Sequence, residues 1–458
     1  SAVNPFKKIE IWNLYLSMLL GLIFAIGFGV LVRQELIGST KMGVVSRSAL
    51  FLAEIPANIK RSMRNLVEIE DQRFPDLSGF NGDYNEEELY LLLPQFNGDI
   101  GESTVSLIDL RNFENLHTWN PDIEMMNALV DKNSEEFKYL DRDKNESLSL
   151  LQHPLLGSDG GLYFQDTSPL RKIDSCSNLI WQNDVNLFHH SIEVDIDGNL
   201  WVPSHLYPQV IEERKVGRKL VQEEGFTDDA IVKLSPDGNI LYEKSVSEIF
   251  IENGMEYLLF AVGDRAFQRD PIHLNDIQPV NFDSDYWKKG DVFLSIRHQS
   301  MVILFRPKTN QIIWQGVGKQ FLQHDVDIID EHSISIYNNN AKHLMHIGET
   351  IDGHNEVLIY DFNTNSYESY LKESLKSEDV RTRSGGISQI LPNGDLYIEE
   401  TDFGRTLYFN YDGSLKWSYV NRSNNGSIYA IAWSRILYKE KDKQHVRSFL
   451  ANKVSCNK

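Results

Sequence analysis

The sequence predicts an all-β domain, a β-propeller, preceded by a single N-terminal transmembrane helix. From about residue 76 onward, short apolar runs rich in β-forming residues alternate with turn sequences. A tryptophan recurs near the end of several of these runs, and a long charge-free apolar run stands near the N-terminus. Roughly 360 residues of repeated antiparallel strands are typical of blades joined around a central channel. A pair of β-sandwiches is the alternative arrangement of such strands.

The apolar run Ile11–Val32 predicts the transmembrane helix. Its 22 residues include no charged side chain, and at about 1.5 Å per residue they match the roughly 30 Å hydrocarbon core of a bilayer. Trp12 and Tyr15 suit the headgroup interface. Basic residues flank the run on both sides, so the positive-inside count does not decide the orientation. We expect a single-pass anchor that carries a soluble domain.

Between anchor and domain, residues 48–66 have apolar side chains near helical spacing, which predicts a short amphipathic helix that Pro56 would interrupt. The sequence therefore divides into four parts: a membrane anchor (1–35), a partly helical connector (36–75), the β-propeller domain (76–440) and a C-terminal tail (441–458).

Turn signals place the strands of the domain. Leu89–Leu93 and Val105–Leu110 have the composition of strands. Hairpin turns followed by apolar runs are predicted at four places: Asp197-Gly198-Asn199, Pro236-Asp237-Gly238-Asn239, Pro392-Asn393-Gly394-Asp395 and Asp412-Gly413. One helix interrupts the pattern, because Ser245 and Glu248 form a capping box that opens a helix through about Leu259.

A weak internal repeat supports the propeller. Tryptophans end similar runs at four positions, Trp119, Trp181, Trp314 and Trp417. The first two intervals are 62 and 133 residues, close to a ratio of one to two, whereas the last, 103, is not a multiple. The period is therefore imperfect.

Composition excludes several classes of function. The 458 residues carry a net charge of −21 and the pI is about 5.1, which argues against nucleic acid as a partner. Cys176 and Cys456, the only two cysteines, lie 280 positions apart. We therefore expect two free thiols rather than a disulfide, although a tail that folds back would allow them to pair.

Basic side chains gather in four segments of this acidic chain. They are Phe188-His189-His190-Ser191, Asp270-Pro271-Ile272-His273-Leu274-Asn275-Asp276, Ser295-Ile296-Arg297-His298-Gln299-Ser300 and Leu322-Gln323-His324-Asp325. Because a chain this acidic repels anions in general, imidazoles and a guanidinium brought together would form a selective anion site.

These segments, in this order and spacing, resemble the bacterial arylsulfotransferases of the PAPS-independent type. The later segments GGISQILPNGDLYIEE and DGSLKWSY are similar to that family's closing blades, and the resemblance covers about residues 76–435. It implies a six-bladed propeller with the active site at the central channel. It also implies transfer of a sulfuryl group from a phenolic sulfate ester to a phenolic acceptor through a sulfohistidine, with no cofactor and no metal.

The resemblance assigns roles residue by residue. His324 matches the nucleophile, and His273 matches a histidine beside the leaving oxygen. Arg297 matches the arginine that holds sulfate oxygens, and His190 matches an anion-binding histidine. We place His189, Asn275 and His298 among the substrate-binding residues. If Arg297 points into the cavity, strand alternation would aim His298 into the blade.

These residue types also suit the chemistry independently of the resemblance. The loose transition state of sulfuryl transfer needs an in-line nucleophile and preorganised positive donors, which histidines and an arginine can supply. Two other interpretations stay open: a histidine-rich zinc or copper site, and a non-catalytic propeller that serves as a binding or assembly subunit of a membrane complex. We expect the domain on the periplasmic or extracytoplasmic side. Neither donor nor acceptor can be named from the sequence.

Overall fold

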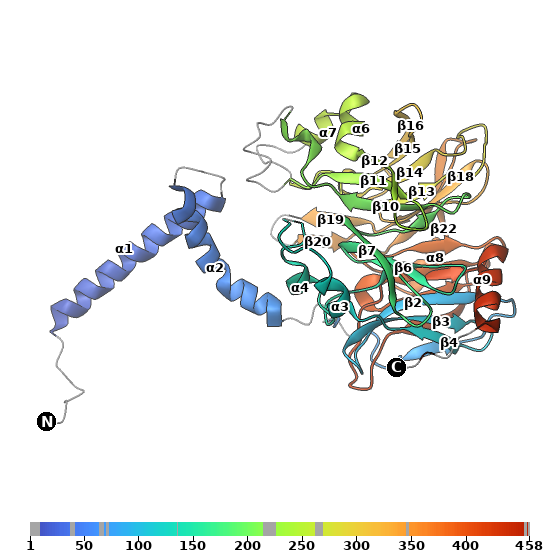
Figure 1. Cartoon of the computed structure of the whole chain (residues 1–458), viewed down its shortest axis with the longest axis horizontal. Helices are drawn as coiled ribbons and strands as arrows, with labels where there is room; N and C mark the ends of the chain where they lie inside the picture. Colours follow the sequence, from blue (N-terminus) through green and yellow to red (C-terminus); the bar gives the residue numbers. More distant parts are fainter. Residues whose placement is uncertain are drawn as a thin grey trace. The chain divides into compact units, whose positions relative to one another are not determined.

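The computed structural model describes residues 10–36, 42–63, 68–69, 73–134, 136–213, 226–261, 269–344, 348–452 and 456. It divides into two compact units, of which the first comprises residues 1–65 with 219–224 and the second the remainder. Figure 1 labels the helices and strands along the chain.

The first unit contains two long helices, α1 (Ile11–Leu36) and α2 (Gly43–Met63), which contact each other. In α1 the stretch Ile11–Gln34 is long and apolar enough to cross a membrane, and none of it is buried within the chain. By length and composition it suits a membrane span or a signal sequence alike. The connector helix begins earlier than predicted, at Gly43, and its backbone stays helical through Pro56; residues 64–66 of the predicted range lie outside the described residues.

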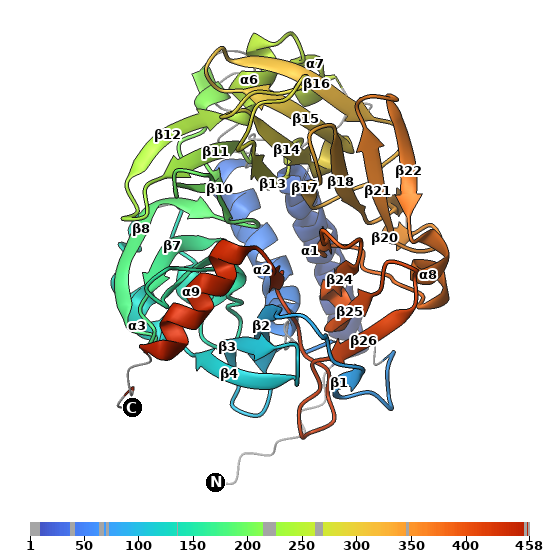
Figure 2. The ribbon, with the colours of Figure 1, turned by 90° about the vertical axis from the view of Figure 1, so that its right-hand side faces the viewer.

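The second unit is a propeller of antiparallel sheets arranged in a ring, seen end-on in Figure 2. Its strands follow one another as four-stranded groups. The groups are β27 (Arg435–Leu437) with β2 (Tyr90–Asn97), β3 (Glu102–Asp109) and β4 (Glu114–Trp119); β5 (Gln152–Leu156), β6 (Leu162–Gln165), β7 (Ser168–Ile173) and β8 (Leu179–Phe188); β9 (Glu193–Val194), β10 (Leu200–His205), β11 (Asp229–Leu234) and β12 (Ile240–Ser245); β13 (Leu274–Pro279), β14 (Val292–Ile296), β15 (Met301–Arg306) and β16 (Gln311–Val317); β17 (Val326–Ile328), β18 (Ser333–Asn338), β21 (Glu356–Asp361) and β22 (Ser366–Tyr370); and β23 (Ser388–Ile390), β24 (Leu396–Glu400), β25 (Arg405–Phe409) and β26 (Leu415–Val420).

Hydrogen bonding divides the ring into fewer separate sheets than the six blades expected. The reason is local: Leu187 and Phe188, at the end of β8, pair with His205 and Ser204 of β10 and so join two successive groups into one eight-stranded sheet. Divided at this two-residue link, the strands form six consecutive four-stranded groups, which we call the first to sixth blades. The ring closes because β27, late in the chain, pairs with β2.

The remaining elements lie outside the blade pattern. β1 (Gly79–Gly82) extends the sixth blade by pairing with β26, and β19 (Ala341–Leu344) and β20 (Gly348–Ile351) form a separate hairpin. The short helices are α3 (Ile123–Ala128), α4 (Leu140–Asp143), α6 (Val246–Glu252), α7 (Tyr257–Phe260), α8 (Lys372–Ser377) and the longer α9 (Glu440–Ala451), with 3-10 turns η2 (Val210–Glu213), η3 (Arg297–Gln299) and η4 (Thr401–Phe403). The Ser245 hydroxyl accepts from the Glu248 N–H and caps α6 as predicted, but that helix ends at Glu252 and α7 is separate.

The four turn sequences each connect consecutive strands of one blade, as predicted. Gly238, in the turn between β11 and β12, has a φ of 82°, a conformation that a residue with a Cβ atom rarely adopts. The hydrophobic core lies between neighbouring blades. One cluster joins Trp201 and Ile231 of the third blade to Leu294 and Ile303 of the fourth.

The tryptophan repeat follows the blades, and its uneven spacing has a structural explanation. The four tryptophans lie on β4, β8, β16 and β26, each the fourth strand counted outward from the inner strand of the first, second, fourth and sixth blades. The intervals therefore span one, two and two blades. The third and fifth blades carry Tyr242 and Tyr367 on the equivalent strands.

The expectation of two free thiols is wrong. Cys176 and Cys456 form a disulfide, with 5.4 Å between their Cα atoms. The tail folds back because α9 packs on the blades through Val446 and Phe449, and the Phe449 ring stacks on Trp119 at 5.8 Å.

Candidate active site

The predicted histidines come together because each lies where the chain enters the inner strand of a blade. His190 precedes β9, His273 precedes β13 and His324 precedes β17, in three successive blades. These inner strands surround the ring axis, so residues at their starts meet at one end of the channel. His190 and His273 both have a positive φ, 61° and 52°, at the turn into the strand.

Ring-to-ring distances define the histidine cluster. The centroid of His190 lies 5.2 Å from that of His273 and 6.3 Å from that of His324. Trp433, which precedes β27, lies 5.5 Å from His190 and 6.0 Å from His324. His298 lies 4.4 Å from His273. Side chains from His190 to Trp433, about 240 positions apart in the sequence, thus belong to one cluster.

His324 is held in one tautomer by two contacts. Its Nδ1 lies 2.6 Å from Oδ1 of Asn339, and the backbone N–H of Gly385 donates to its Nε2 at 2.9 Å. The amide of Asn339 cannot be reversed without loss, because its Nδ2 donates to the carbonyls of Thr382 and Gly385. Nδ1 of His324 therefore carries the proton, and the lone pair of Nε2 accepts the hydrogen bond from Gly385.

Electrostatics keep this imidazole neutral. Burial, followed by the charge of Arg297, holds the pKa of His324 well below 6.5. Burial also holds the pKa of His190 well below 6.5, and the neighbouring imidazoles lower it further. A neutral, buried histidine with an oriented lone pair is chemically a nucleophile or a metal ligand.

His273 is paired with an acid. Its Nδ1 lies 2.6 Å from Oδ2 of Asp270, whose Oδ1 accepts from the His273 backbone N–H. Burial raises the pKa of Asp270, but the hydrogen bond and the charge of His273 outweigh burial and bring this pKa to about 2. Asp270 is therefore ionised at neutral pH, and it can support a positive charge on His273 while leaving Nε2 of His273 available.

Arg297 and His298 lie on the 3-10 turn η3, and both face the cluster. Nη1 of Arg297 lies 2.9 Å from Nε2 of His298, whose Nδ1 donates to the carbonyl of Asp270 at 2.6 Å. The prediction that the His298 side chain points into the blade is wrong. Strand β14 ends at Ile296, and side chains in the 3-10 turn that follows do not alternate between the two faces of the sheet. Burial, then the charge of His273, lowers the pKa of His298 to about 4.

A carboxylate compensates the guanidinium. Arg297 is 6% exposed, and its Nη2 donates to Oε1 of Glu349 on the β19–β20 hairpin. The Nε atom of Arg297 is buried with no hydrogen-bond partner. An incoming sulfate group would therefore share Arg297 with Glu349.

The other two predicted substrate-binding residues lie behind the cluster. Asn275 is fully buried, and its Nδ2 donates to the carbonyl of Gln323, the residue before His324. His189 is also buried, with Nδ1 2.7 Å from Nδ1 of His190. Their contacts position His324 and His190 respectively.

A separate cavity of about 450 Å³ has the opposite character. Its lining includes Glu193, Asp325, Asp327 and Arg435 and none of the predicted catalytic residues. Burial and the charge of Glu193 raise the pKa of Asp327 to about 7. This lining mixes carboxylates with the basic side chains of Arg435, Lys439 and Lys441, so the histidine cluster with Arg297 is the better candidate for an anion site.

Five contributors to the cluster were missed by the sequence analysis: Asn339, Gly385, Asp270, Glu349 and Trp433. Asp270 had a local signal, since it stands three residues before His273 in a short Asp-Pro-Ile-His segment. Gly385 lies in a Gly-Gly pair, and a Cβ atom on its neighbour Gly386 would come within 2.7 Å of the Tyr337 ring. Asn339 and Glu349 carry no motif.

Together these features define a β-propeller with a cluster of histidines and an arginine at one end of its channel, in which burial keeps His190 and His324 neutral. This class accommodates group transfer from anionic substrates. The chain belongs to the arylsulfotransferase (ASST) family, whose model matches residues 158–422. No curated protein was found that matches the sequence.

The solved structures that this chain is similar to are distant from it. A Bacteroides caccae protein of unknown function is 12% identical, over 76% of this chain and 98% of that one, with a TM-score of 0.45. Virginiamycin B lyase from Staphylococcus aureus is 8% identical, over 60% and 71%, with a TM-score of 0.33. A streptogramin B lyase is 9% identical, over 76% and 97%, with a TM-score of 0.36. These likenesses carry nothing further about this chain.

Proposed function

We propose that the protein is a membrane-anchored, PAPS-independent aryl-sulfate sulfotransferase that carries the sulfuryl group on His324. The single observation that supports this most is the fixed tautomer of His324, with Nδ1 bound to Asn339 and Nε2 facing the Gly385 N–H. Membership of the arylsulfotransferase family supports the reaction class. The fixed lone pair supports the covalent route.

In the first step, the Gly385 N–H that occupies the lone pair of His324 Nε2 moves aside, and Nε2 attacks the sulfur of the phenolic sulfate ester. An N–S bond forms, the bond from sulfur to the aryl oxygen breaks, and the phenolate leaves with the electron pair. Nε2–H of protonated His273 donates a proton to the departing oxygen, an effect of about 10²–10⁴-fold for a well-placed general acid. Asp270, ionised as its lowered pKa indicates, balances the charge on His273 before this transfer.

In the second step, a phenolic acceptor replaces the product. Its oxygen attacks the sulfur, the N–S bond breaks, and the phenolic proton passes to Nε2 of His273, which is then ready for another cycle. Arg297 and His190 hold the sulfate oxygens in both steps, where negative charge is spread over the transition state. Asn339 and Asp270 act as positioning residues, because each contacts a reacting imidazole rather than the substrate.

Residues 11–32 would anchor this enzyme in the membrane as a single span, with the propeller on the periplasmic or extracytoplasmic side. The Cys176–Cys456 disulfide supports that side, since such bonds persist in oxidising compartments. Protease protection in membrane vesicles of known orientation tests it. A propeller that is digested only in vesicles with the cytoplasmic face outward would contradict it.

The decisive experiment is intact-mass analysis of the full chain after incubation with para-nitrophenyl sulfate. We expect a gain of one sulfuryl group, mapped to the peptide that contains His324, and release of nitrophenolate when phenol is added. His324→Ala should lose both, because no other residue replaces the covalent carrier. His332→Ala, which removes a histidine outside the cluster, is the matched control and should retain both.

Circular dichroism must show that His324→Ala is folded. If that folded variant keeps near-wild-type turnover, the covalent mechanism is wrong for this chain. If the wild type shows neither turnover nor a sulfated histidine with a range of aryl sulfates, the alternative function remains: a non-catalytic propeller that binds or assembles partners at the membrane.

A further inference from the structure

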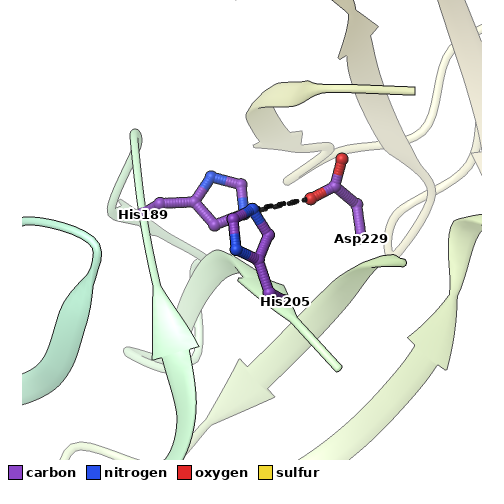
Figure 3. Close-up of side chains that lie close together, drawn as sticks. All are labelled: His189, His205 and Asp229. Atoms are coloured by element: carbon purple, nitrogen blue, oxygen red, sulfur yellow. Dashed lines mark ion pairs between the residues drawn. The ribbon is translucent and has the colours of Figure 1, made fainter. Parts of the chain in front are cut away.

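Behind the cluster, His189, His205 and Asp229 direct one ligand atom each toward a common point (Figure 3). Nε2 of His189 lies 3.2 Å, and Nε2 of His205 lies 3.3 Å, from Oδ1 of Asp229. The three side chains come from three places in the third blade and its junction with the second. His205 and Asp229 are cross-strand partners at adjoining ends of β10 and β11, so the backbone register fixes their spacing.

These separations match those between ligands of one small cation. Around a tetrahedral ion with bonds of about 2.0–2.2 Å, neighbouring ligand atoms lie about 3.3–3.5 Å apart. Two of the three candidate ligand atoms are left without a hydrogen bond. Nε2 of His189 and Oδ1 of Asp229 are both buried and have no hydrogen-bond partner. A fully buried carboxylate with an unpartnered oxygen is costly unless a cation or proton donor compensates it.

We propose that His189, His205 and Asp229 form a binding site for a divalent first-row metal ion, and that the ion is Zn²⁺. Two imidazole nitrogens and one carboxylate oxygen are a ligand set that Zn²⁺ binds with a fourth position open. The side chain of His205 is about one-third exposed, so water can reach the fourth position.

A second group with similar composition does not compete for the ion. Asp270, His273 and His298 also lie within ligand distance of one another. Their Nδ1 atoms are already engaged, however, since that of His273 contacts the Asp270 carboxylate and that of His298 donates to the Asp270 carbonyl. In the His189 group, Nε2 of His189 and Oδ1 of Asp229 have no hydrogen bond, whereas in the second group Asp270 and both nitrogens of His298 are engaged.

Zn²⁺ at this site would influence the reaction by fixing the tautomer of His190. An ion on Nε2 of His189 leaves the ring proton on Nδ1, which then donates to Nδ1 of His190 at 2.7 Å. His190 must consequently carry its own proton on Nε2, where it can donate to a sulfate oxygen. This consequence rests on the proposed role of His190, whereas the metal site does not.

The test measures Zn²⁺ on the full chain, purified in detergent without a polyhistidine tag. After removal of metal with a chelator, titration with ZnCl₂ should give one tight equivalent per chain, and the apparent Tm should rise on loading. Metal content by mass spectrometry and the visible absorption of a Co²⁺-substituted sample give readouts that are independent of activity.

Matched variants identify the site. His205→Gln and Asp229→Asn should lose the tight equivalent, and His205→Gln decides if Asp229→Asn fails to fold. His332→Gln should keep it, although Nδ1 of His332 lies 3.5 Å from two carboxylates outside the cluster. His324→Ala should keep it as well. Equal Zn²⁺ binding by wild type and His205→Gln, or loss in His324→Ala, would overturn the assignment.

Binding of inorganic sulfate to loaded and stripped protein tests the consequence for His190. We expect weaker sulfate binding after Zn²⁺ removal, and restored binding when Zn²⁺ is returned. Unchanged sulfate affinity with intact Zn²⁺ stoichiometry would overturn the positioning of His190 and leave the metal site standing. The proposed sulfuryl transfer fails separately, by the absence of a sulfated His324.

Discussion

Replacing Asn339 by alanine tests whether His324 is held as a neutral nucleophile in a single tautomer. In the native protein Oδ1 of Asn339 accepts from Nδ1 of His324 at 2.6 Å, and Nδ2 donates to two buried backbone carbonyls. The variant removes the acceptor that selects the Nδ1–H tautomer. A share of molecules would then carry the proton on Nε2, where it blocks attack on sulfur.

Two magnitudes follow from these contacts. A hydrogen bond of this kind contributes about 0.5–1.5 kcal/mol net, which corresponds to roughly a threefold to tenfold lower kcat when it acts on tautomer choice. The stability cost is separate. The Gly385 carbonyl loses its Asn339 donor, whereas the Thr382 carbonyl keeps the amide of Asn355, so about 1–3 kcal/mol is expected.

The assay is steady-state turnover of para-nitrophenyl sulfate with a phenol acceptor, run beside urea denaturation. Asn355→Ala is the matched control. Asn355 is equally buried and donates to the backbone carbonyls of Thr382 and Asn339, whereas the Nδ1 of His324 is bound by the side chain of Asn339 alone among the described residues. We expect both variants to lose stability and only Asn339→Ala to lose kcat.

The result that refutes this reasoning is equal kcat in Asn339→Ala and wild type at a temperature where both are folded. Equal losses of kcat in both variants would also refute it, because the effect would then reflect general packing around Thr382. The hydrogen bond from His324 to Asn339 raises the His324 pKa, so its removal should not move the acidic limb of the pH profile upward.

Three further perturbations have definite expected outcomes. Arg297→Gln should lower kcat roughly 10²–10³-fold. Because the charge of Arg297 lowers the pKa of His324, the acidic limb of the pH–rate profile should also move up toward 6.5 in this variant. An acidic limb that does not move would contradict this role of Arg297. Glu349→Gln should lower the KM for an aryl sulfate roughly threefold to tenfold, about 1 kcal/mol, because Arg297 then has no carboxylate partner. An unchanged KM would show that the ion pair between Arg297 and Glu349 does not compete with the aryl sulfate. Cys456→Ser should lower the free energy of unfolding by up to about 5 kcal/mol in urea melts with kcat retained, and coincident melting curves would exclude a stabilising role for the disulfide.

The propeller could be predicted because its signals are local. A Pro-Asn-Gly-Asp turn and an outer-strand tryptophan each report on one hairpin, and the sequence repeats such hairpins. The gathering of His190, His273 and His324 could be expected for a related reason, since each histidine precedes an inner strand in a similar segment. Their chemical roles remain predictions.

What could not be predicted depends on contacts between distant residues. The disulfide joins positions 280 apart, and nothing near Cys456 indicates that α9 returns to the blades. Glu349 contacts Arg297 from the β19–β20 hairpin, which lies outside the blade pattern and which no sequence periodicity predicts. His298 was misplaced because a strand period was extended by two residues into a 3-10 turn.

The closure of the ring by β27 has a consequence for the order in which the protein becomes competent. Chains fold from the N-terminus as they are made, yet the first blade lacks its inner strand until residues 435–437 have emerged and paired with β2. Trp433, which lies against both His190 and His324, arrives with that same segment. A chain that is still being synthesised therefore has its histidines but no finished site around them, and the proposed nucleophile is enclosed only when the last strand is in place.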